Sequence, residues 1–131
     1  MEYQIYVMKA KENLAAAETC LNSGYRNASV SRAYYAMFQA AIALLIHKGI
    51  KPPSGSFGHQ WVQSMVSEKF TKRQKIMSRE YASYLLEAQE IRNRADYSLI
   101  DTSKTVCQKQ LSKARDFSER LLEELPHVSQ S

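Results

Sequence analysis

The chain has 131 residues, of which 44% are hydrophobic and 24% charged, and its formal net charge is +5. This length predicts one domain with a core of its own, without disulfides or metals. The four glycines and three prolines are few, which favours long helices with short connections. The positive charge permits an acidic partner such as RNA but does not require one, because solvated helix faces often carry a similar excess.

The expected compartment follows from the cysteines and from the N-terminus. Cys20 and Cys107 have no metal-ligand spacing, so we interpret them as reduced thiols of a cytoplasmic protein. The first residues mix charge into every turn, which argues against a signal peptide. The longest apolar run, residues 40–46, is too short to cross a bilayer. We therefore expect no membrane association.

Apolar residues recur at helical spacing from the start of the chain. A first helix is expected from about Glu2 to Ser23, with Gly24 as its left-handed cap. A second is expected from Asn27 or Ser29 to Gly49. This second helix is apolar on two sides, so it either lies at the centre of the fold or is shared with another subunit.

The remaining elements follow a loop at residues 48–59, which is rich in Gly, Pro and Ser. A short helix is predicted over His59–Phe70, a long one over Ile76–Tyr97, and a last one from near Thr102 to Pro126, with position 101, 102 or 103 as its cap. No strand pattern occurs. The predicted fold is an all-α, up-and-down bundle of four long helices and one short helix over residues 1–125, with a frayed tail at 126–131.

Several chemistries lack their motifs in this chain. There is no glycine loop of the phosphate-binding type, no pairing of His with carboxylates at metal-ligand spacing, and no recognisable nucleophile setting. We therefore expect neither a cofactor nor a metal.

The segment EIRNRADYSL, residues 90–99, poses a specific question. Arg92 continues a helical stripe of apolar and aromatic residues, and a half-buried arginine is costly unless it is paired. Asp96 lies one turn later and is the nearest partner in sequence. We predict that Arg92 is partly buried and hydrogen-bonded to Asp96, to a tyrosine hydroxyl or to another subunit. A structural ion pair and a substrate-binding arginine both remain open.

Two segments, SRAYYAMFQAAIALLIHKGI (residues 31–50) and RNRADY (92–97), resemble the HEPN-domain proteins, in particular small stand-alone prokaryotic members. The resemblance implies a helical bundle that usually forms a homodimer. Many members are metal-independent ribonucleases, with an Arg followed after four to six residues by His, and two such motifs meet across the dimer cleft. Some are toxins neutralised by a small nucleotidyltransferase encoded beside them. Others only bind nucleotides or nucleic acid.

The chemistry of such a motif assigns roles to residues of this chain. When a 2′-hydroxyl attacks the neighbouring phosphate, a guanidinium stabilises the added charge and an imidazole transfers a proton. Arg92 occupies the arginine position, with Asn93 and Asp96 as supporting residues, and Tyr97 stands where the shortest motif places His. A phenol with a pKa of about 10 is a weak base at neutral pH. His59 would serve instead only if the fold brought it to Arg92.

We therefore interpret the chain as a dimeric nucleotide- or RNA-binding or assembly module without the catalytic His, in a toxin–antitoxin or defence setting. The alternative is an active metal-independent ribonuclease toxin with a nucleotidyltransferase partner. Other candidates also have two interpretations. Tyr97 is a catalyst or a core-edge aromatic; Tyr34 and Tyr35 pack in the core or line a dimer cleft. The basic connection (Lys72, Arg73, Lys75 and Arg79) binds RNA or is a solvated loop.

Overall fold

The structure is a computed structural model that describes residues 2–99 and 101–126. All regular elements in these two ranges are helical, which confirms the predicted all-α bundle. Their bounds are α1 Glu2–Asn22, α2 Arg26–His47, α3 His59–Met65, the π-helix η1 Val66–Arg73, α4 Arg79–Tyr97 and α5 Lys104–Leu122. Apart from Pro126, the predicted frayed tail lies outside the described residues.

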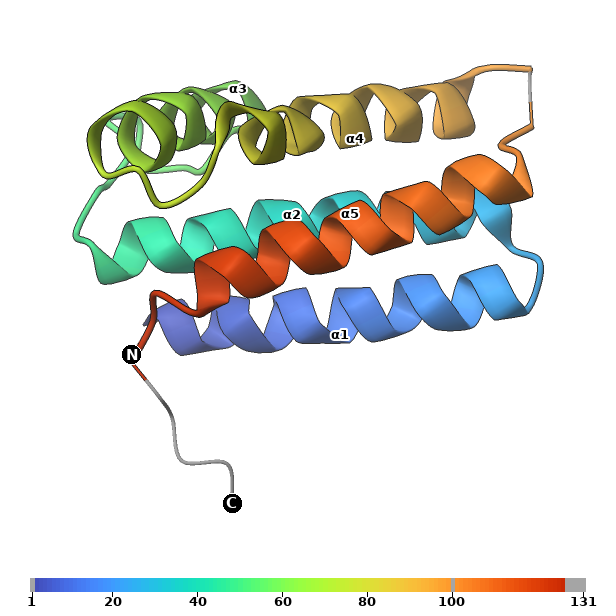
Figure 1. Cartoon of the computed structure of the whole chain (residues 1–131), viewed down its shortest axis with the longest axis horizontal. Helices are drawn as coiled ribbons and strands as arrows, with labels where there is room; N and C mark the ends of the chain where they lie inside the picture. The colour runs from blue at the N-terminus through green and yellow to red at the C-terminus, as the bar shows by residue number, and fades with distance from the viewer. Residues whose placement is uncertain (1, 100, 127–131) are drawn as a thin grey trace.

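The long helices run up and down and lie roughly parallel to one axis (Figure 1). Helix α2 contacts α1, α3, α4 and α5, so it forms the centre of the bundle. In Figure 1, α1 lies on one side of the α2 and α5 pair, and α3 and α4 lie on the other. The connection between α2 and α3 returns the chain so that α3 starts beside α2.

The central position of α2 explains why it is apolar on two sides. Most of its residues from Val30 to Leu45 are buried inside this single chain. By length and composition α2 would be apolar enough to cross a membrane, but most of its length is buried in the bundle. The two-sided apolar pattern is thus accounted for by the monomer. It gives no independent support for a homodimer.

The helix ends follow the predicted local chemistry. Gly24 has φ +80, the left-handed conformation that a glycine adopts without steric cost, directly after α1. The Ser103 hydroxyl accepts a hydrogen bond from the backbone N–H of Val106 at 3.1 Å and caps α5. Ser78 caps α4 in the same way through Tyr81 N–H at 3.2 Å. The Ser78 cap fixes where α4 begins.

The region between α3 and α4 differs from the prediction. The short helix does not end at Phe70 but continues as the π-helix η1 to Arg73, so Lys72 and Arg73 are helical rather than part of a loop. Helix α4 begins at Arg79, not at Ile76. Ile76 and Met77 are buried outside any helix, and both of their N–H groups donate to the Phe70 carbonyl. Their burial imitates the apolar spacing of a helix, which explains the misplaced boundary.

Candidate functional site

Helix α4 places Arg92 against the aromatic face of α2. The guanidinium carbon lies 5.1 Å from the centre of the Tyr35 ring and 6.0 Å from that of Tyr34. Both distances are in the range of cation–π attraction. Only 18% of the Arg92 side chain is exposed. The predicted partial burial of Arg92 is confirmed, and aromatic rings provide much of its environment.

Asp96 forms an ion pair with Arg92, as its spacing predicted. Arg92 Nε lies 3.3 Å from Asp96 Oδ2, but this buried N–H makes no well-directed hydrogen bond, so the pair is ionic and the predicted hydrogen bond to Asp96 is not formed. Arg92 Nη1 donates to Asn93 Oδ1 at 3.4 Å, a long contact. Within residues 2–99 and 101–126, Nη2 has no ion-pair or hydrogen-bond partner. The guanidinium is therefore held in place with part of its donor capacity unused.

His59, the first residue of α3, also lies against the rings of Tyr34 and Tyr35. Its ring stacks on Phe38 with centroids 4.7 Å apart, and its Nδ1 is hydrogen-bonded to the Tyr34 hydroxyl. The Tyr34 ring thus lies against both Arg92 and His59. The tertiary structure therefore brings His59 near Arg92, which is the condition under which His59 could take the place of the motif His. No sequence spacing indicated it, because 33 positions and the connection at residues 74–78 separate the two residues.

Burial and nearby charge keep the His59 ring and the Tyr34 hydroxyl neutral near pH 7. Burial lowers the pKa of His59, and the positive charge of Arg92 lowers it further. Burial strongly raises the pKa of the Tyr34 hydroxyl; Tyr35 adds to this effect and Arg92 opposes it. Arg92, Asp96, Tyr34, Tyr35 and His59 together are called the Arg92 cluster below.

A second arginine, which sequence reasoning missed, borders this cluster. The guanidinium carbon of Arg32 lies 5.4 Å from the centre of the Tyr35 ring. Arg32 Nη1 also donates to Asn13 Oδ1 at 3.1 Å, which ties it to α1. Its position three residues before Tyr35 on a helix was the available signal. Tyr35 therefore has two cationic neighbours.

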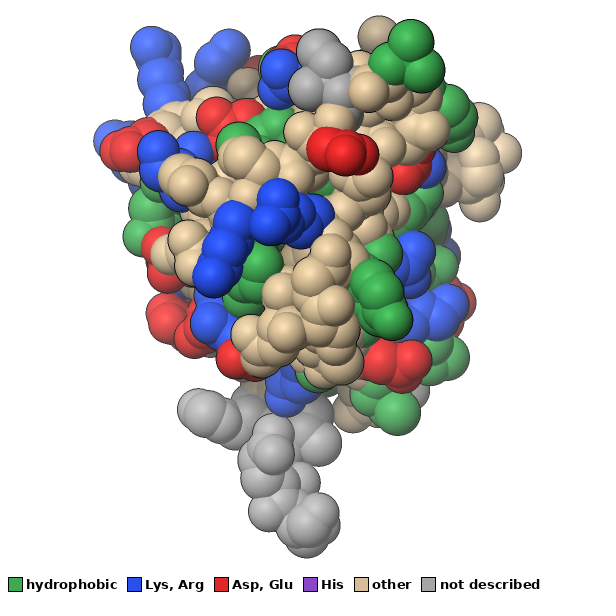
Figure 2. Space-filling view, turned by 90° about the vertical axis from the view of Figure 1, so that its right-hand side faces the viewer, with side chains coloured by type: hydrophobic (Ala, Val, Ile, Leu, Met, Phe, Trp, Pro, Cys, Tyr) green, Lys and Arg blue, Asp and Glu red, His purple; other side chains and the backbone are tan. Residues whose placement is uncertain are grey.

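Tyr97 does not pack at the edge of the core. It is 80% exposed, and Leu99, two residues later, is fully exposed. The interpretation of Tyr97 as a core-edge aromatic is therefore wrong. Tyr25 in the α1–α2 turn is also exposed, at 66%. Figure 2 looks onto this end of the bundle, where basic, acidic and apolar side chains are interspersed.

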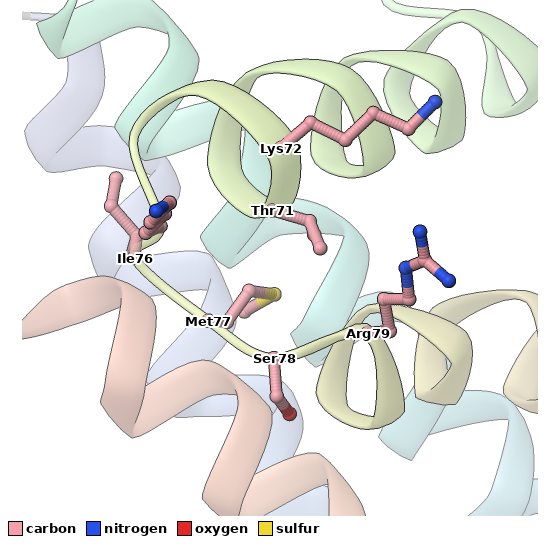
Figure 3. Close-up of a pocket in the computed structure, with 7 residues that line it drawn as sticks. Thr71, Lys72, Ile76, Met77, Ser78 and Arg79 are labelled. Carbon is pink, nitrogen blue, oxygen red and sulfur yellow. The ribbon is translucent and has the colours of Figure 1, made fainter.

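The basic connection lies apart from the Arg92 cluster. Lys72 from η1 and Arg79 from α4 extend to the same side of an open pocket (Figure 3). Lys72 and Arg73 lie 3.9 Å and 3.5 Å from the Glu68 carboxylate, so acidic charge offsets part of theirs. Arg79 and Arg92 are 13 positions apart on α4, or about 20 Å at a rise of about 1.5 Å per residue. The two groups of predicted site residues are thus not brought together.

Comparison with known proteins matches the HEPN domain family to residues 3–125. A Methanocaldococcus jannaschii protein named "Putative toxin MJ0605" is 30% identical over 128 residues, which cover 97% of this chain and 91% of that protein. Another from the same organism, "Putative toxin MJ0142", is 35% identical over 73% of this chain. "UPF0332 protein PH1297" from Pyrococcus horikoshii is 38% identical over 64% of it. The matches span only 62% and 56% of these last two proteins.

Proposed function

The chain belongs to the HEPN-domain family, and we propose that it binds single-stranded RNA through the Arg92 cluster. The observation that carries the proposal is the position of Arg92. A guanidinium with unused donor capacity lies on the rings of Tyr34 and Tyr35, with an imidazole on the same aromatic group. Guanidinium groups bind phosphate through directed hydrogen bonds, and a base can stack on the Tyr35 ring, which is half-buried, whereas Tyr34 is fully buried.

The remaining charges fit a backbone-binding role. Arg32 beside Tyr35 supplies a second cation for a neighbouring phosphate. Asp96 holds the Arg92 side chain while offsetting part of its charge. Alternating cationic and aromatic side chains are the arrangement by which proteins bind single strands without reading the sequence. The basic connection is then a solvated surface or a separate, weaker contact.

The biological setting follows from the relatives. Two of them carry the name "Putative toxin", and we propose a cytoplasmic toxin–antitoxin or defence role for this chain, with a nucleotidyltransferase as the antitoxin partner. We also propose a homodimer formed through the end of α4. The exposed Tyr97, Leu99 and Tyr25 supply apolar surface there for a second copy. Sedimentation as a monomer at micromolar concentration would contradict the dimer.

A direct test compares two arginines of the same helix. Binding of a fluorescent poly-U oligonucleotide is measured at low salt for the wild type, Arg92→Ala and Arg94→Ala. Arg94 is exposed and serves as the matched control, because it removes the same charge two residues away. We expect Arg92→Ala to weaken binding at least about tenfold, since a hydrogen bond to a charged group contributes about 1.5–3 kcal/mol. Equal losses in both variants would reduce the effect to net charge and overturn the proposed site.

A second function, metal-independent RNA cleavage, is favoured by one observation. Tyr97 stands where the shortest motif places His, but His59 brings an imidazole to the Arg92 cluster from another part of the chain. Incubation of RNA with the protein in EDTA tests this function, with Arg92→Ala as the control. Cleavage by the wild type that Arg92→Ala abolishes would establish it. Binding without cleavage would support the first proposal.

A further inference from the structure

His59 occupies a position in which only one edge of its ring is engaged by the protein. The ring stacks on Phe38 at 4.7 Å with an interplanar angle of 27°, and it lies 5.6 Å from the centre of the Tyr34 ring. Nδ1 is hydrogen-bonded to the Tyr34 hydroxyl. Nε2, on the opposite edge of the ring, has no recorded partner in the part of the chain that the structure describes. The ring is fixed in place, and His59 is only half-buried.

The direction of the Tyr34–His59 hydrogen bond follows from the surroundings of the hydroxyl. Tyr34 is fully buried, and a buried hydroxyl must place its hydrogen on an acceptor. In the described ranges, His59 Nδ1 is the one partner recorded for that hydroxyl. The hydroxyl therefore donates to Nδ1, and a neutral imidazole then carries its own hydrogen on Nε2.

The charged and titratable groups around His59 favour this neutral form. They are Tyr34 and Tyr35 from α2 and Arg92 from α4, with Asp96 behind Arg92. Burial raises the pKa of the Tyr34 hydroxyl, which is therefore neutral near pH 7, and the Arg92 cation opposes a second positive charge on the His59 ring. The cluster thus offers one guanidinium and one neutral N–H donor. That combination suits a singly charged phosphodiester.

We propose that His59 is the second phosphate-contacting residue of the Arg92 cluster, with Tyr34 as the positioning residue that orients Nε2–H toward an internal phosphodiester of RNA. This inference rests on the proposed RNA-binding function and specifies its ligand. Arg92 supplies the charge, and His59 supplies a directed donor from a different element. The Nε2–H tautomer also makes His59 a hydrogen-bond donor rather than the base that 2′-hydroxyl attack requires.

Binding is then coupled to protonation of the ring. A phosphate oxygen on Nε2–H favours the imidazolium, in which the added proton lies on Nδ1 and Nδ1–H donates to the Tyr34 hydroxyl oxygen, so the bound protein takes up a proton more readily than the free protein. Affinity for RNA therefore rises as the pH falls from about 7.5 to about 5.5. The rise is at most about tenfold per pH unit for a single proton.

The tautomer is tested first, on the free protein, so the result does not depend on RNA binding. Nitrogen-15 NMR of the histidine rings assigns the protonated nitrogen of His59, with His59→Gln identifying its signals. We expect the Nε2–H form in the wild type and a mixture in Tyr34→Phe, which retains the ring but lacks the hydroxyl. An Nδ1–H ring in the wild type would overturn the inference and favour the cleavage function instead.

The contact is tested by poly-U binding between pH 5.5 and 7.5. We expect His59→Ala to weaken binding about three- to tenfold, the effect of one hydrogen bond. His59→Gln retains an N–H donor and should restore most of the affinity, but without the pH dependence. The exposed His47 at the end of α2 provides the control, and His47→Gln should change neither quantity.

The two proposals fail in different ways. If Arg92→Ala binds RNA like the wild type, the proposed function is wrong whatever the state of His59. If Arg92→Ala abolishes binding while His59→Ala binds normally with an unchanged pH profile, the RNA site stands and the role of His59 is wrong. If the protein binds mononucleotides with a terminal phosphate but not RNA, the assignment of an internal phosphodiester is wrong.

Discussion

Helix α4 carries two clusters that differ in how completely their charged groups are paired. Toward α5, Glu87 accepts hydrogen bonds from Lys113 at 2.7 Å and from Gln110 at 3.0 Å, and Lys113 also lies over the Tyr84 ring. Toward α2, Arg92 has an ion pair without a well-directed hydrogen bond, and much of its contact is with aromatic rings. The Glu87 cluster (Glu87, Lys113 and Gln110) joins two helices. The Arg92 cluster holds a guanidinium with N–H donors that have no acceptor in the described residues.

This difference separates a structural ion pair from a binding arginine. In the Glu87 cluster the opposite charges of Glu87 and Lys113 contact each other directly. Removing either charge should therefore lower the stability of the fold without changing RNA binding. In the Arg92 cluster, the neighbouring residues hold the guanidinium and the imidazole in place but leave some of their N–H donors without an acceptor among the residues that the structure describes. An incompletely satisfied but well-oriented group is the arrangement expected where a ligand completes the hydrogen bonds.

The largest expected effect is a reciprocal pair of outcomes from Arg92→Ala and Lys113→Ala. Arg92→Ala should weaken RNA binding at least about tenfold with little change in melting temperature. Lys113→Ala should leave RNA binding unchanged and lower the stability by about 0.2–1 kcal/mol, because the pair is partly exposed. Oligonucleotide titration and thermal unfolding of both variants give the comparison. If Arg92→Ala destabilises the fold and spares binding, the two clusters are both structural.

Replacing the acidic partners gives a smaller and opposite pair of effects. Asp96→Asn removes a negative charge beside the proposed phosphate site while keeping an oxygen near Arg92. We expect RNA affinity to rise about two- to fivefold, the effect of about 0.5–1 kcal/mol for a partly exposed charge. Glu87→Gln should not change it. If Asp96→Asn instead weakens RNA binding, the Asp96 carboxylate contributes more to affinity by orienting Arg92 than it costs by repelling the phosphate.

The pH dependence of stability should separate the clusters as well. The pKa of His59 is lowered by burial and by Arg92, so the unfolded chain binds that proton more readily, and stability falls as the pH drops below about 6.5. The pKa of Glu87 is lowered chiefly by its hydrogen bond from Lys113. Its contribution is therefore present above about pH 4.5 and is lost below it. His59→Gln should remove the upper part of the melting-temperature decline and Glu87→Gln the lower part. Identical profiles for wild type and both variants would contradict these assignments.

The smallest effect concerns the basic connection, which serves as a reference outside both clusters. Lys75 has φ 50, a conformation that costs a non-glycine residue about 1 kcal/mol. Lys75→Gly relieves this strain but loosens the unfolded chain, so stability should rise by no more than about 0.5 kcal/mol. RNA binding by the Arg92 cluster should be unchanged. A large loss of RNA affinity would return the basic connection to the binding surface.

The helical bundle could be predicted from the amino-acid sequence, because apolar spacing, Gly24 and Ser103 are local signals that act within a few residues. The sequence also indicated the Arg92–Asp96 pair, which lies within one helical turn. Local signals misplaced the start of α4, since buried Ile76 and Met77 imitate a helix. Only the tertiary structure decided that α2 is central, that Tyr97 is exposed, and that Arg32 and His59 border the rings beside Arg92. Those contacts depend on how α2, α3 and α4 pack, and packing between distant segments leaves no fixed spacing in the sequence.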